Sequence, residues 1–206
     1  DLEPPFLCLV VSGGHTLIVD VQNYTKFRIL GTTRDDAAGE CFDKCARAMG
    51  YPYPGGIHLD KASQSGNPKA FSLPKPKIAE NAYDFSFSGL KTAVVNLLHN
   101  AQQKGETICR DIAAFPGWYL IAATVLFAVQ IYCDFGGYST IAIAGGVSAN
   151  SGVRESLQKA CDKRNFTLYM PPLSLCGDNG AMIACAGSYA FDAGIRADSS
   201  LNASAT

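Results

Sequence analysis

Net charge of either sign is nearly absent from this chain of 206 residues, because 17 Lys and Arg residues balance 18 Asp and Glu residues to a formal net charge of −1. Composition therefore indicates no broad basic surface for nucleic acid, and any RNA contact must use a local patch or a partner. Charged residues make up 17% and hydrophobic residues 48% of the sequence, which excludes a disordered chain.

Several familiar signatures are also missing. None of the eight cysteines forms a CxxC pair, and most lie in apolar segments where cysteine behaves as a small hydrophobe, so we expect reduced thiols in a cytoplasmic protein. No His-Glu-x-x-His string supports a protease. The start of the chain carries no signal peptide and runs directly into an apolar strand, from which we expect a fragment of a longer protein.

Apolar runs and turn residues predict alternating strands and helices, which is typical of the α/β class. We expect strands at residues 6–11, 16–21, 26–30, 140–144 and 166–170, the first three as a β-meander. We expect helices from about residue 35 to 49 and at residues 59–65, 89–103, 151–163 and 178–193, with an ordered loop at residues 66–88. Asp35 and Asp36 carry the negative charge that a helix N-terminus favours.

Three glycine-rich turns stand at strand ends or helix starts. The first contains Val10, Val11, Ser12, Gly13 and Gly14. Residues 144–150, Ala-Gly-Gly-Val-Ser-Ala-Asn, follow a strand and open a helix, and residues 177–181 enter the last helix. Glycines let the backbone approach a ligand, and successive N–H groups can hold a phosphate. Tight structural turns would have the same composition, so both interpretations stay open here.

Three aspartates are candidate ligand residues. Asp43 and Asp60 flank the Tyr-Pro-Gly-Gly loop of residues 53–56, either as solvated helix charges or as a pair that holds ribose hydroxyls. Asp178 begins the last expected helix, either as an N-cap or as a ligand of a hard cation. Together with the three turns, these residues indicate a nucleotide-binding lobe like that of an actin-like or sugar-kinase-like ATPase.

Seven short strings of this sequence resemble, in order and spacing, the TsaD family of tRNA threonylcarbamoyltransferases, once called glycoproteases. They lie at residues 11–16, 35–40, 42–44, 53–56, 84–92, 144–150 and 178–184. The resemblance implies an actin-like ATPase fold of two ribonuclease-H-like lobes, with the amino-terminal lobe largely missing. It also implies transfer of threonylcarbamoyl from threonylcarbamoyl-adenylate to N6 of the adenosine beside the anticodon of ANN-decoding tRNAs.

The resemblance further implies roles for individual residues. Residues Val10 to Gly14 would contact the adenylate phosphate, Asp43 and Asp60 would hold the ribose, Gly56 would approach it, and Asn150 would lie beside the nucleotide, which is threonylcarbamoyl-adenylate or ATP. Asp178 would bind iron or zinc, but the family's paired histidines are missing, so the metal site would be incomplete. Expected partners are tRNA and TsaB-like and TsaE-like subunits in the cytoplasm, with no membrane.

Residues 115–143 do not fit that family and divide the chain into TsaD-like residues 1–114, a foreign apolar segment, and TsaD-like residues 144–206. The segment resembles membrane-bound O-acyltransferases, although its apolar run from Trp118 to Val129 is shorter than the ~20 residues of a spanning helix. A divergent buried helix is the alternative. The functional hypotheses are therefore a tRNA-modifying transferase fragment that is inactive alone, a non-catalytic nucleotide- or partner-binding module, or a membrane acyltransferase fragment.

Overall fold

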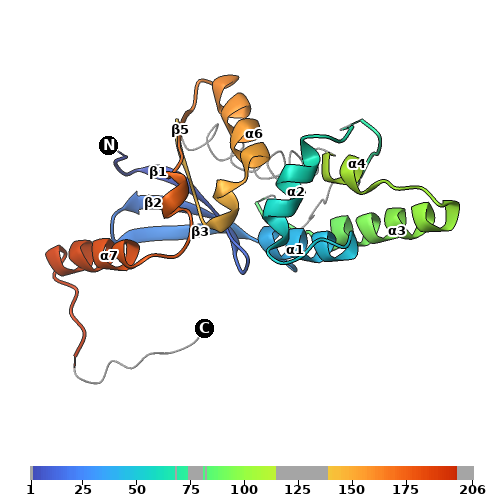
Figure 1. The fold of residues 1–206 in the computed structure, drawn as a ribbon. Coiled ribbons are helices and arrows are strands. Elements are labelled where there is room, and N and C mark those ends of the chain that lie inside the picture. The colour runs from blue at the N-terminus through green and yellow to red at the C-terminus, as the bar shows by residue number, and fades with distance from the viewer. Residues whose placement is uncertain (1, 68, 74–80, 82, 115–138, 199–206) are drawn as a thin grey trace.

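A five-stranded sheet with strand order β3-β2-β1-β4-β5 forms the centre of the computed structural model, which describes residues 2–67, 69–73, 81, 83–114 and 139–198 (Figure 1). The antiparallel meander comprises β1 (Phe6–Val11), β2 (Thr16–Asn23) and β3 (Lys26–Thr32). On the other side of β1, β4 (Thr140–Ala144) and β5 (Thr167–Tyr169) continue the sheet in parallel. The central β1 thus joins the two halves of the sequence.

Helices gather mainly beyond one end of this sheet, where Figure 1 shows α1 to α4 together and α7 apart from them beside the meander. The helices are α1 (Ala38–Ala48), α2 (Gly55–Ser63), α3 (Ser88–Lys104), α4 (Cys109–Ala114), α6 (Ser151–Asp162) and α7 (Gly180–Asp192). Two short 3-10 helices, η1 (Gly146–Ala149) and η2 (Leu173–Leu175), flank α6 and β5 in sequence. The Tyr24 and Tyr189 rings stack with centroids 4.1 Å apart and fasten α7 to the meander.

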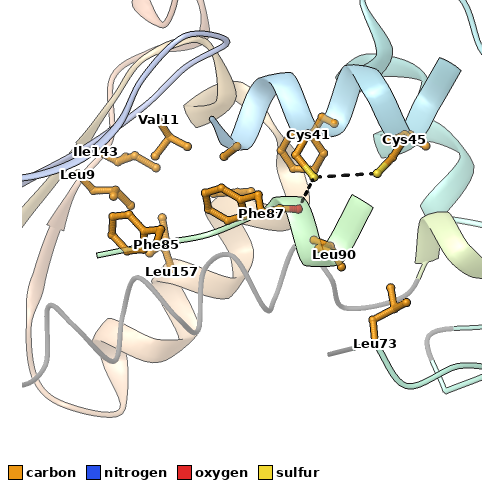
Figure 2. Packing of buried hydrophobic residues seen from close by; sticks show 14 of the residues in the cluster. Leu9, Val11, Cys41, Cys45, Leu73, Phe85, Phe87, Leu90, Ile143 and Leu157 are labelled. Atoms are coloured by element: carbon orange, nitrogen blue, oxygen red, sulfur yellow. Dashed lines mark hydrogen bonds between the residues drawn. The ribbon is translucent and has the colours of Figure 1, made fainter. Parts of the chain in front are cut away.

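The core forms where the inward side chains of β1 meet the helices. Leu7, Leu9 and Val11 alternate along β1 and are all buried, as the period of two along a strand requires. Figure 2 shows Phe85 and Phe87 filling the space between β1 and α1. The packing of these aromatic rings holds α1 and α3 in fixed positions relative to the carboxyl end of β1.

Most expected elements are confirmed, with two instructive differences. The strands β1 and β4 have the expected bounds, but α2 begins at Gly55 rather than near residue 59, and the short helix α4 was not expected. The early start of α2 has a tertiary cause, because the Asp43 carboxylate accepts a hydrogen bond from the Gly55 amide at 2.7 Å. A carboxylate from another helix thus satisfies an amide that the helix itself leaves unpaired.

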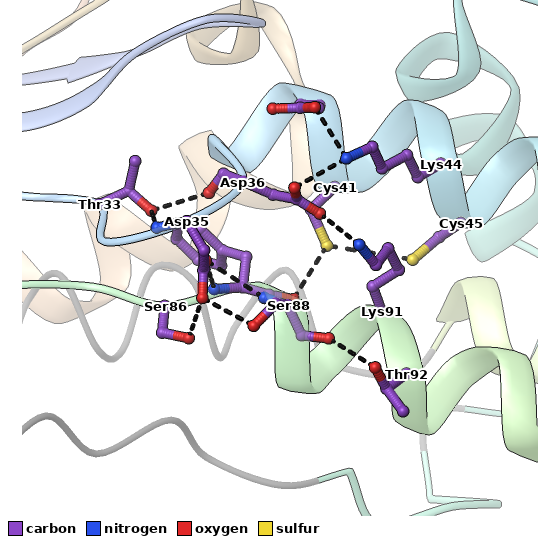
Figure 3. Close-up of polar contacts among 12 residues, drawn as sticks. Thr33, Asp35, Asp36, Cys41, Lys44, Cys45, Ser86, Ser88, Lys91 and Thr92 are labelled. Carbon is purple, nitrogen blue, oxygen red and sulfur yellow. Dashed lines mark hydrogen bonds and ion pairs between the residues drawn. The ribbon is translucent and has the colours of Figure 1, made fainter.

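Asp35 and Asp36 do lie beside a helix start, but Asp35 serves a different helix from the one expected (Figure 3). Its carboxylate accepts hydrogen bonds from the Phe87 amide at 2.7 Å and the Ser88 hydroxyl at 2.7 Å, at the beginning of α3. The Asp36 carboxylate instead forms ion pairs with Lys44 Nζ at 2.7 Å and with Lys91 Nζ at 2.9 Å. The N-cap of α1 is Ala37, which offers no side-chain cap. These two acids therefore tie α3 to α1.

Acid is expected to weaken this tie. Burial raises the pKa of Asp35, but hydrogen bonds from Ser86, the Phe87 amide and Ser88 outweigh it, so the pKa lies below its ordinary value of 3.8. Burial also raises the pKa of Asp36. The hydrogen bonds and positive charges of Lys44 and Lys91 outweigh burial, so this pKa too lies below its ordinary value. A carboxyl with a depressed folded-state pKa contributes stability above the unfolded-state pKa and loses it as the pH falls through the folded-state pKa.

We therefore expect the free energy of unfolding to fall below about pH 4, as measured by urea titrations at a series of pH values. The Asp35→Asn variant should be less stable near pH 7 and should show a shallower decline in acid. As a matched control, Asp162→Asn changes an acid whose partner is Gln158 in its own helix, and it should keep the wild-type profile. An identical slope for wild type and Asp35→Asn would show that Asp35 contributes nothing to the tie.

Candidate functional site

A cavity of about 490 Å³ lies where the β1–β2 turn, α1, α2 and η1 meet. This volume falls within the usual range for small-molecule sites. Its lining consists of Gly13, Gly39, Phe42, Asp43, Tyr53, Pro54, Gly56, Ile57, Asp60, Lys61, Gly146, Val147, Ala149 and Asn150. Two of the three glycine-rich turns therefore face one common cleft, because Gly13 comes from the first turn and four lining residues come from the turn at residues 144–150.

The β1–β2 turn is held from both sides. The Ser12 amide donates to the His15 carbonyl at 2.8 Å, and the His15 amide donates to the Ser12 hydroxyl at 3.0 Å. Below the turn, the Gly39 amide at the start of α1 donates to the Ser12 carbonyl at 3.0 Å. A Cβ on Gly39 would lie 2.7 Å from that carbonyl oxygen, so only glycine allows this approach. The turn is thus fixed while Gly13 stays open to the cavity.

The opposite wall begins where β4 ends. Gly145 has φ +94° and lies so close to β1 that a Cβ would meet the Val11 carbonyl oxygen at 2.4 Å. The next residue, Gly146, has open space at its Cβ position. Asn150 ends this wall and caps α6, with its side-chain oxygen accepting from the Val153 amide at 3.0 Å. Its side-chain NH2 group makes no hydrogen bond within the part of the chain that the structure describes, and is available to a ligand.

Two carboxylates stand on the helical side of the cavity. Asp43 uses one oxygen for the Gly55 amide. Asp60 accepts from the Ser151 hydroxyl at 2.7 Å and from the Ser151 amide at 3.4 Å, which joins α2 to the start of α6. Neither acid forms an ion pair with another described residue. Each ionised carboxylate can accept about four hydrogen bonds, so both retain capacity for ligand hydroxyls.

The expected nucleotide-binding residues divide into two groups. Gly13, Asp43, Gly56, Asp60 and Asn150 line one cavity. The remaining members of the first turn do not line it; they are Val10, Val11, Ser12 and Gly14. Sequence reasoning missed the apolar wall of Phe42, Tyr53 and Ile57 and the cation Lys61. The Tyr-Pro-Gly-Gly string was a signal for Tyr53, a residue that is 79% exposed and whose ring is available for stacking.

Asp178 lies apart from this cavity. It is exposed, it is absent from the cavity lining, and the N-cap of α7 is its neighbour Asn179, whose side chain accepts from the Met182 amide. Within residues 2–67, 69–73, 81, 83–114 and 139–198, no group of three or more His, Cys, Asp or Glu side chains gathers. The residues that the structure describes therefore do not fit a metal centre.

The apolar segment of residues 115–143 lies mostly outside the described residues. Its last residues belong to β4, which pairs with β1 and β5. No helix in the described part of the chain combines the length and the apolar character that crossing a membrane requires.

Comparisons with known proteins identify relatives over nearly the whole chain. A family model described as "TsaD: tRNA N6-adenosine threonylcarbamoyltransferase" matches residues 1–185. Proteins with that same description are 47% identical over 204 residues in Clostridium botulinum (strain 657 / Type Ba4) and 46% identical over 204 residues in Clostridioides difficile (strain 630). Each alignment covers 98% of this chain but 60% of the relative, so the chain spans about three fifths of their length.

A crystal structure of full-length HypF in the phosphate- and nucleotide-bound form shares the fold, with a TM-score of 0.66 at 11% identity over 90% of this chain and 33% of HypF. This likeness and the mixed sheet agree with the expected α/β fold of the actin-like ATPase class. The family match also confirms the resemblance that the seven sequence strings indicated. On the strength of that match, the chain belongs to the TsaD family.

Proposed function

We propose that this chain provides the adenylate-binding lobe of an enzyme that transfers threonylcarbamoyl to N6 of the adenosine beside the anticodon in ANN-decoding tRNAs. The observation that carries the proposal is the cavity, where the glycine turn at Gly13, the turn ending at Asn150 and the acids Asp43 and Asp60 converge in a member of the TsaD family. The ligand would be threonylcarbamoyl-adenylate or ATP.

The lining matches the parts of an adenylate. Backbone amides beside Gly13 would receive the phosphate, as glycine turns do elsewhere. Asp43 and Asp60 would accept hydrogen bonds from the two ribose hydroxyls, because ionised carboxylates are acceptors without donors. The exposed side chains of Tyr53 and Ile57 offer apolar surface to the base. The Asn150 amide would donate to the nucleotide from the opposite wall.

In the proposed reaction, the N6 amine of the tRNA adenosine attacks the carbonyl carbon of the threonylcarbamoyl group. A C–N bond forms, the C–O bond to the phosphate breaks, AMP leaves with the electron pair, and N6 loses a proton. The residues of this chain would hold the AMP half, so that the reacting carbonyl is presented in a fixed position. TsaD proteins generally bind a metal, and iron or zinc at Asp178 remains a proposal for the complete protein. Because the described residues do not fit such a centre, no step is assigned to it.

The remaining expectations also belong to the complete protein. With a net charge of −1, tRNA binding would use a local patch or the proposed TsaB-like and TsaE-like subunits. A non-catalytic nucleotide- or partner-binding module is the second candidate, because Asp178 has no cluster of ligating partners within the described residues. Adenylate binding would separate the transferase from a module that binds only partners, and activity of the complete enzyme would separate it from a module that binds only nucleotide.

The direct test of the cavity is isothermal titration with AMP. We expect wild-type chain to bind AMP and the Asp43→Asn variant to bind it more weakly by about 1–3 kcal/mol, the usual cost of losing a charged hydrogen-bond partner. Asparagine keeps an oxygen for the Gly55 amide, so α2 should retain its start. The Asp162→Asn variant, which changes an exposed acid on α6, should bind like wild type. An unchanged dissociation constant in Asp43→Asn would leave Asp43 as a solvated helix charge.

A further inference from the structure

Arg154, in the first turn of α6, connects two segments that are separate in the sequence. Its Nε donates to the Ser148 carbonyl at 2.6 Å. Its Nη2 donates to the Pro171 carbonyl at 2.5 Å and lies 3.2 Å from the Cys176 sulfur. One guanidinium therefore holds acceptors of η1 on one side and acceptors of residues 171–176 on the other.

The first of these segments is a wall of the cavity. Ser148 lies between Val147 and Ala149, both of which line the cavity. Its side chain is fully buried, and its hydroxyl has no hydrogen-bond partner among the described residues. The Ser148 amide bonds to the Gly145 carbonyl within the same turn. The bond from Arg154 thus fixes Ser148 to a helix outside the turn.

The second segment leads to Asp178 and does not line the cavity. Cys176 in this segment is buried, with 5% exposure, although the leucines of η2 on its amino-terminal side are exposed. An arginine suits this junction because its rigid planar fork donates in several fixed directions at once, whereas the lysine ammonium on its flexible stem does not. Within the described residues its three acceptors are neutral, so the guanidinium orients two backbone carbonyls and a sulfur rather than pairing with a carboxylate.

We infer that Arg154 is a positioning residue that fixes the cavity wall of η1 and couples it to residues 171–176. A ligand that orders η1 then also orders the segment that leads to Asp178, and the coupling works in both directions. The identity of the ligand rests on the proposed function, but the mechanical link does not.

The link can be measured without ligand by amide hydrogen exchange on the whole chain. Four amides report on it, because Ser148 and Asn150 bond within the η1 turn and Leu175 and Cys176 bond within residues 171–176. In Arg154→Lys we expect exchange at all four to accelerate together, by about tenfold or more, while amides of β1 keep their wild-type rates. A general loss of stability would instead accelerate exchange throughout the sheet.

Two further variants make the result specific. Arg164→Lys changes the same residue type just beyond the opposite end of α6, where Nη1 donates to the Ala160 carbonyl, and it should leave the four amides unchanged. Cys176→Ala removes only the acceptor at the far end of the link and should still accelerate exchange at Ser148 and Asn150. This Cys176 variant also tests the coupling if Arg154→Lys fails to fold. Acceleration confined to one segment, or to neither, would overturn the coupling.

Titration with AMP adds a ligand-dependent readout. In wild type, AMP should slow exchange at Leu175 and Cys176, although neither residue lines the cavity. In Arg154→Lys this distant protection should disappear and the dissociation constant should rise by about tenfold. If distant protection persists in the variant, the link runs through other residues and the inference is wrong. If wild type binds no AMP, the proposed function fails, while the ligand-free exchange rates still decide the role of Arg154.

Discussion

Replacement of Gly145 by alanine is expected to lower the free energy of unfolding by about 2–6 kcal/mol and to abolish AMP binding. The backbone there has φ 94° and ψ 164°, a region that is essentially restricted to glycine. An added Cβ would also lie 2.4 Å from the Val11 carbonyl oxygen, so the end of β1 or the start of η1 must move. Urea denaturation and calorimetric titration of the same preparation would measure both effects.

The neighbouring residue supplies the control. Gly146 lies in the same turn, but its Cβ position has no neighbouring heavy atom within 4 Å. Gly146→Ala should therefore change the free energy of unfolding by no more than about 0.5 kcal/mol. The two variants can be compared directly because the chemical change is identical. Equal losses of stability in the two variants would refute the argument from close approach.

The second large effect concerns catalysis. We expect the chain alone to transfer no threonylcarbamoyl to tRNA above background, even with threonylcarbamoyl-adenylate supplied. The described residues assemble no group of metal ligands around Asp178, and Asp178 itself is exposed outside the cavity. A reactive mixed anhydride also needs a site from which water is excluded. Incorporation of labelled threonine into tRNA would measure the activity.

An amphipathic helix in place of residues 115–139, combined with the amino-terminal part of the Clostridium botulinum relative that this chain does not cover, should restore transfer if the proposed function is correct. The Asp43→Asn variant of that fusion should lose most of its activity because it holds the adenylate poorly. Substantial incorporation by the unfused chain would show that the expected metal ligands are unnecessary or are replaced within it. An amphipathic helix in place of residues 115–139 should improve solubility without restoring activity, as the foreign-segment prediction requires.

Local sequence patterns predicted the sheet better than the helix starts. The apolar run from Phe6 to Val11 and the β-branched residues of 140–144 mark buried strands, and both have the expected bounds. Helix α2 starts early because Asp43, a residue of another helix, caps Gly55, and no local pattern contains that information. Similarly, Asp35 precedes α1 in sequence but bonds to the start of α3. Both differences arise from tertiary contacts that override local propensity.

Those cavity residues that belong to short, characteristic sequence strings could be predicted from the sequence. Glycine turns and paired acids identified Gly13, Asp43, Asp60 and Asn150, all of which line it. Lys61 and the apolar wall were missed, because an isolated lysine or phenylalanine on a helix has no distinctive spacing. Asp178 is the opposite case, since the family string is present but the described residues form no group of three or more ligating side chains around it. A motif therefore predicted a role whose geometry depends on residues elsewhere.

The pairing of β1 with β4 also has a consequence during protein synthesis. Leu7 pairs with Ile141, so the two strands that lead into the cavity walls are paired in space but separated by most of the sequence. The β1–β2–β3 meander can form from local contacts, whereas this closure is costly in entropy and slow. On the ribosome, the meander would therefore emerge and begin to fold well before η1 has been synthesised. A nucleotide in the cell could bind only after that point, and could not guide the earlier steps of folding.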